Sequence, residues 1–146
     1  MIRWRKPYWM VIAAAPLLLL LNPGLWDISI SAIRYQLEVT GSSVYEYHTL
    51  TGHWPTHADD LGSTSLPLKL RYWRMLVEQG NIVVVWHTDL SADPKQNSNA
   101  VLAYHNQGLI AAFGRKWVCW GNLRTEYISN EKLRQALATQ GVNAAK

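Results

Sequence analysis

The clearest structural signal in this 146-residue sequence lies at residues 117–128. Two strand-like runs, Trp117-Val118-Cys119-Trp120 and the residues from Leu123 to Ile128, flank the dipeptide Gly121-Asn122. Gly-Asn between two such runs is typical of a two-residue hairpin turn. The sequence therefore predicts an antiparallel hairpin in which Trp120 faces Leu123.

Further strands are predicted upstream of this hairpin. Residues 68–72 alternate apolar with basic side chains, and residues 82–86 and 100–105 are short apolar runs. These patterns are typical of strands. Residues 51–65 and 92–99 are rich in Gly, Pro, Asp, Ser, Thr or Asn, so we expect a loop and a long surface connection there.

A helix is expected on each side of these strands. From Asp27 onward, apolar residues recur at intervals of three, four and seven, which predicts an amphipathic helix that Gly41 weakens; they are Ile30, Ile33, Leu37 and Val44. After the hairpin, Ser129 is expected to cap a short final helix with Glu131 in its first turn, Leu133 and Leu137 as its apolar stripe, and Gly141 at its end.

The N-terminus reads as a membrane anchor. Residues 10–21 are apolar and uncharged, and aromatic side chains that favour the membrane interface flank them at Trp4, Tyr8, Trp9 and Trp26. At 1.5 Å per residue, the distance from Trp9 to Trp26 is about 26 Å, close to the thickness of a hydrocarbon core. The sequence predicts an anchor over residues 1–26 and an outer domain over residues 27–146. The alternative is a cleaved signal peptide, with Ser29 and Ser31 as small residues near the cleavage site.

Charge sets the orientation and limits the partners. Arg3, Arg5 and Lys6 precede the apolar run, which predicts a cytoplasmic N-terminus by the positive-inside rule. The formal net charge is +4, and without these three residues the chain has 11 Lys and Arg against 10 Asp and Glu. A nearly neutral domain has little long-range field to collect phosphates, so we expect a lipid bilayer and other proteins as partners and no nucleic acid.

Few residues offer catalytic or metal-binding chemistry. His53 and His57 are four apart with Asp59 close by, which is the basis of a metal-binding or hydrolytic alternative. Pro55 between the two histidines disfavours the helix that would bring them onto one face. A second candidate is an acid–base pair of His87 and His105 with Asp89. No nucleophile elbow or phosphate-binding loop is present, so we expect no catalytic residues and no cofactor.

Aromatic and cationic residues provide candidates for protein binding. The chain has eight tryptophans, and most of those outside the membrane flank are expected to fill the core. A sheet face that carries several of them could dock a protein, and the candidates are Arg71, Trp73, Trp117 and Trp120. Cys119 is the single cysteine, so no internal disulfide forms, and we expect it to act as a small apolar residue in a strand.

The segment Tyr47-His48-Thr49-Leu50-Thr51-Gly52-His53-Trp54-Pro55, followed by Asp59-Asp60-Leu61-Gly62, resembles the junction between helix and sheet in type IV pilins and type II secretion pseudopilins. The tail from Val101 to Leu137 is also similar to the end of pilin-like domains. The resemblance implies an α+β fold, with a membrane helix that continues into an amphipathic helix packed on a small antiparallel sheet. It also implies assembly or scaffolding in place of catalysis.

The N-terminus departs from the pilin pattern. No Gly precedes Met10, residues 10–21 contain no Glu, and paired cysteines are absent. We therefore expect a permanently anchored, pilin-like domain on the periplasmic side of a bacterial inner membrane. The main hypothesis is a non-enzymatic structural or assembly component that binds other proteins of a membrane or secretion complex. The alternative is an accessory subunit of a larger membrane complex, such as an energy-converting one.

Overall fold

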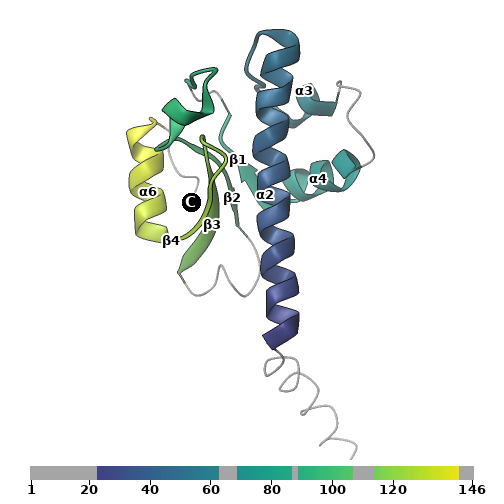
Figure 1. Ribbon diagram of the computed structural model, residues 1–146, viewed down its shortest axis with the longest axis vertical. Coiled ribbons are helices and arrows are strands. Elements are labelled where there is room, and N and C mark those ends of the chain that lie inside the picture. Colours follow the sequence, from purple (N-terminus) through teal and green to yellow (C-terminus); the bar gives the residue numbers. More distant parts are fainter. Residues whose placement is uncertain (1–22, 63–68, 87–88, 107–113, 142–146) are drawn as a thin grey trace, which may run out of the picture. The chain divides into compact units, whose positions relative to one another are not determined.

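The computed structural model describes residues 23–62, 69–86, 89–106 and 114–141, and it has an α+β fold with a four-stranded antiparallel sheet and a C-terminal helix (Figure 1). The elements in chain order are α2 (Pro23–Thr51), α3 (Ala58–Gly62), α4 (Lys69–Glu78), β1 (Ile82–Val84), the 3-10 helix η1 (Pro94–Asn97), β2 (Val101–His105), β3 (Arg115–Trp120), β4 (Thr125–Ser129) and α6 (Asn130–Thr139). The chain divides into two units, residues 1–32 and 33–146, and the sheet belongs to the second unit.

The predicted membrane anchor over residues 1–26 lies almost entirely outside the described residues. Across the described ranges, no helix combines the length and apolar character that a bilayer crossing requires. The predicted span, residues 10–21, lies outside the described residues, as do Trp4, Tyr8 and Trp9. Trp26 falls within α2, but its side chain is outside the described set. Pro23 stands at the first position of α2, where its missing N–H removes no helical hydrogen bond.

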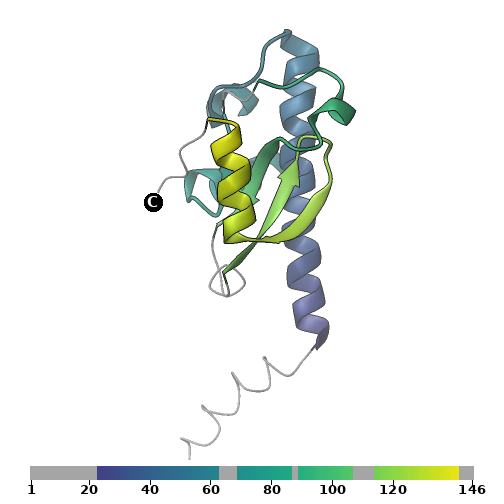
Figure 2. The same ribbon diagram turned by 90° about the vertical axis from the view of Figure 1, so that its left-hand side faces the viewer.

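The sheet has the strand order β1-β2-β3-β4, with every neighbouring pair antiparallel. The strands predicted over residues 82–86, 100–105 and 117–128 are confirmed, with slightly different ends. Figure 2 shows α6 across one face of the sheet and α2 behind the other face. The strand β2 is therefore buried on both of its faces, which explains why residues 101–104 read as an apolar run.

Two apolar clusters fill the spaces on either side of the sheet. The cluster towards α2 contains Leu37, Val44, Tyr45, Leu61, Leu76, Ile82, Val84, Leu90, Leu102, Ala103 and Cys119. The cluster towards α6 contains Val85, Val101, Tyr104, Val118, Trp120, Ile128, Leu133 and Leu137. The predicted apolar stripes of both helices are thus confirmed at Leu37 and Val44 in α2 and at Leu133 and Leu137 in α6.

The ends of α6 also match the sequence prediction. The Ser129 hydroxyl accepts a hydrogen bond from the Lys132 backbone N–H, which caps the first turn. Gly141 follows the helix with a φ of +72°, a conformation that glycine adopts without steric cost. The Gln140 side-chain amide accepts a hydrogen bond from the Val101 N–H at 2.9 Å and so ties the end of α6 to β2.

The predicted two-residue turn is wrong, because the hairpin loop contains three residues. The Trp120 N–H donates to the Arg124 carbonyl at 2.9 Å, so Trp120 lies opposite Arg124 and not opposite Leu123. The Leu123 N–H donates back to the Trp120 carbonyl, and Leu123 itself has a φ of +64°. A left-handed residue at the end of a three-residue loop is a common hairpin solution, although it costs a branched side chain about 1–2 kcal/mol. Packing of Leu123 against the cluster below α2 offsets that cost.

The strand predicted over residues 68–72 is also wrong, since Lys69–Glu78 forms α4. The alternation was too short to distinguish a strand from a helix, and Leu76 and Val77 extend the apolar pattern at helical spacing. The Gly80 N–H donates to the Val77 carbonyl and the Asn81 N–H to the Leu76 carbonyl, with Gly80 at a φ of +71°. This arrangement is a Schellman motif that ends a helix. Gly80 therefore ends α4 and does not belong to a turn between two strands.

Gly41 was expected to weaken α2, but it lets the helix approach the sheet. A Cβ at this position would lie 2.8 Å from the Cys119 sulfur and 3.0 Å from Leu123 Cδ2. No larger residue fits that separation without moving β3 or the hairpin loop. In the predicted loop over residues 51–65, the short helix α3 is a further difference from the sequence prediction.

Candidate protein-interaction surface

The register of β3 and β4 brings two aromatic rings together on the sheet face towards α2. Two hydrogen bonds show which residue pairs of this ladder are hydrogen-bonded: the Trp120 N–H donates to the Arg124 carbonyl, and the Asn130 N–H donates to the Gly114 carbonyl. Bonded and non-bonded pairs alternate, so Trp117 and Tyr127 form a non-hydrogen-bonded pair, in which side chains approach most closely. Their ring centroids are 5.4 Å apart, at an interplanar angle of 32°.

Each ring of this pair lies close to one arginine. The Arg34 guanidinium, on α2, lies 5.8 Å from the centre of the Trp117 ring. The Arg115 guanidinium lies 4.5 Å from the centre of the Tyr127 ring, and its Nη2 donates to the Tyr127 carbonyl at 2.7 Å. We call Arg34, Trp117, Tyr127 and Arg115 the Arg–aromatic row. Both arginines are exposed and both rings are half-buried, so the row forms part of the surface.

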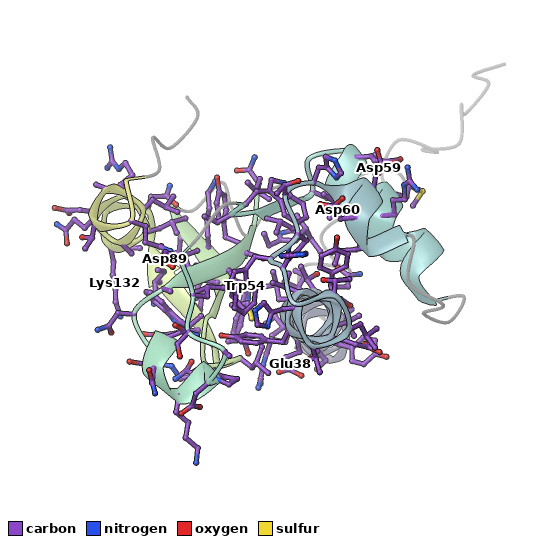
Figure 3. All side chains as sticks on the ribbon, turned by 90° about the horizontal axis from the view of Figure 1, so that it is seen from above. Glu38, Trp54, Asp59, Asp60, Asp89 and Lys132 are labelled. Atoms are coloured by element: carbon purple, nitrogen blue, oxygen red, sulfur yellow. The ribbon has the colours of Figure 1, made fainter. Side chains whose placement is uncertain are left out.

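One carboxylate borders the Arg–aromatic row. Glu38 lies one helical turn after Arg34 on α2, and its carboxylate is 4.0 Å from the Arg34 guanidinium (Figure 3). The Thr125 hydroxyl, from β4, donates to the same carboxylate oxygen at 3.4 Å. An exposed ion pair at this separation contributes little to folding, typically under about 1 kcal/mol. Arg34 therefore keeps hydrogen-bonding capacity for another partner.

The other predicted interaction residues have different surroundings. Trp120 is 5% exposed, lies in the cluster towards α6 and donates through Nε1 to Glu126 at 3.1 Å. A ring buried in this way offers little contact area to a partner. Arg71 and Trp73 belong to α4, and their side chains lie outside the described set.

Sequence reasoning found Trp117 but missed the rest of the row. The signal that could have found Tyr127 is the strand register of the hairpin. When Trp120 pairs with Arg124, Tyr127 lies opposite Trp117. The predicted pairing of Trp120 with Leu123 shifts this register by one residue. Such a shift assigns side chains to the wrong neighbours. The approach of Arg34 depends on the packing of α2, which no local pattern specifies.

The polar residues before α4 are paired with one another. The Asp60 carboxylate accepts hydrogen bonds from the Thr56 and His57 backbone N–H groups at 2.7 and 3.3 Å, and its other oxygen is 3.0 Å from His57 Nδ1. The hydrogen bond from the Thr56 backbone is the main reason that the pKa of Asp60 is lowered. Asp59 pairs with Arg74 of α4.

These contacts leave the metal-binding alternative without a ligand cluster. Within residues 23–62, 69–86, 89–106 and 114–141, no three His, Cys, Asp or Glu side chains converge to hold a metal ion. His53 is exposed in the turn after α2, and Figure 3 shows Asp59 and Asp60 on α3.

The second candidate pair is only partly within the described chain. His105 ends β2, and burial, helped by Lys116, lowers its pKa. The imidazole is therefore neutral at pH 7. Asp89 is exposed, and His87 lies outside the described residues.

Cys119 is a packing residue, as the sequence predicts. It has no exposed surface, and burial, with a contribution from Glu38, raises the pKa of its thiol to about 12. Only the thiolate is nucleophilic, so the native protein should not react with a thiol reagent.

We expect an aromatic disulfide reagent at pH 8 to label Cys119 more than about a hundredfold more slowly in native protein than in urea. The release of the coloured thiolate measures the rate. Rapid, complete labelling without denaturant would contradict the buried position of this strand.

Comparisons with protein-family models, with curated proteins and with solved structures found no match for this chain. The functional interpretation therefore depends on the residues themselves.

Proposed function

We propose that the chain is a non-enzymatic, single-pass membrane protein whose outer domain binds other proteins of a membrane or secretion assembly. The Arg–aromatic row carries this proposal. Trp, Tyr and Arg are the residues most enriched among those that dominate protein–protein binding energy. Here two half-buried rings are held in contact and flanked by exposed guanidinium groups from a helix and a strand.

The N-terminal sequence supports an anchor in a bacterial inner membrane. Basic residues precede an apolar run with aromatic flanks, and the orientation that follows has a cytoplasmic N-terminus and a periplasmic outer domain.

The arrangement of α2 supports a pilin-like outer domain. Residues 33–51 of this helix pack along one face of an antiparallel sheet, as the resemblance implies. The helix α6, on the opposite face, closes the second side of the sheet and leaves the row on the α2 side as a surface.

Native purification of the tagged, full-length chain in mild detergent tests the proposal. We expect an intact mass that includes Met1 and a fixed set of copurifying membrane proteins. Trp117→Ala and Tyr127→Thr should each reduce their recovery about tenfold or more, because each removes a ring from the row. Threonine retains strand propensity at position 127.

Tyr35→Ala is the matched control, since it removes a ring that is 52% exposed on α2 without touching the row. Thermal unfolding of each variant separates lost binding from lost folding. A shortened chain that runs alone would overturn the proposal. Partners that remain bound to both ring variants would exclude the row as the binding surface.

A further inference from the structure

We draw no further inference here: the strongest candidate, the Arg–aromatic row on the sheet face towards α2, belongs to the surface already described as the candidate partner-binding site, and nothing in the structure shows what covers it.

Discussion

Gly121→Ala is expected to lower the free energy of unfolding by about 3 kcal/mol. A Cβ at this position would lie 2.4 Å from Asn97 Cβ and 2.5 Å from the Asn97 carbonyl oxygen. The Gly121 N–H also donates to the Ala100 carbonyl at 2.6 Å, and its carbonyl accepts from the Tyr45 hydroxyl at 2.6 Å. Because the loop is fixed on both sides, it cannot move away from the clash.

Urea unfolding monitored by tryptophan fluorescence measures this loss, and the melting temperature should fall by about 10 °C. Gly80→Ala is the control: it forces alanine to a φ of +71° but meets no atom within 4 Å, so it should cost only about 1–2 kcal/mol. Equal stability of Gly121→Ala and the wild type would show that the hairpin loop and the segment around Asn97 are not in this contact.

Asn97→Asp is expected to cost about 3 kcal/mol at pH 7, although the two side chains have nearly the same shape. Asn97 Nδ2 donates to the Tyr45 hydroxyl at 2.6 Å and to the Ser91 and Asp93 carbonyls at 2.8 and 3.3 Å. Its Oδ1 accepts from the Ser91 N–H at 2.9 Å. A carboxylate would keep the last bond, but it would turn a charged acceptor towards three oxygen atoms in a site that is 7% exposed.

The pH dependence gives this prediction a distinct sign. Burial beside carbonyl oxygens should raise the pKa of the new carboxyl group in the folded state, so the folded state binds more protons and the variant gains stability as the pH falls from 7 to 5. The wild type, in contrast, should lose stability as the pH falls further into the acidic range. Hydrogen bonds to Thr56 and Lys132 lower the pKa values of Asp60 and Glu126, respectively, so their contributions are lost as the pH falls through those values.

Urea unfolding at pH 7 and at pH 5 measures the stability that Asn97→Asp loses at pH 7 and the stability that it regains at pH 5. Tyr45→Phe is the companion variant, because it removes the hydroxyl that joins Asn97 to the Gly121 carbonyl. If Asn97→Asp loses less than about 1 kcal/mol and shows no gain at pH 5, the polar contacts around Asn97 do not hold the segment of η1 against α2.

The strands were predictable where the apolar run was bounded by clear turns. The hairpin, β1 and β2 have this property. The helix α6 was predictable for a different reason, namely its Ser129 cap and its apolar stripe. The segment of α4 was not predictable, because five alternating residues fit both a strand and the start of a helix. The Schellman motif at its end depends on Gly80, and a glycine before an apolar run is equally compatible with a turn between strands and with the end of a helix.

The candidate surface was less predictable than the fold. Trp117 and Trp120 stand on the same strand three residues apart, and alternation puts them on opposite faces. Sequence composition cannot tell which face is covered by a helix; packing of α6 buries Trp120, while the α2 side leaves Trp117 partly exposed. Gly41 allows α2 to lie close to β3, and Arg34 approaches Trp117 from this helix.

Site-specific photo-crosslinking in cells tests directly whether the Arg–aromatic row contacts a protein partner. The photoreactive residue p-benzoylphenylalanine is placed at Tyr127 or at Trp117, and at Leu50 as a control, because Leu50 is 65% exposed on α2 and lies outside the row. We expect one discrete crosslinked product from each of the two row positions, loss of this product when Arg34 and Arg115 are replaced by Gln, and no product from Leu50. Crosslinks from Leu50 alone, or none from the row while partners still copurify, would contradict binding at the row.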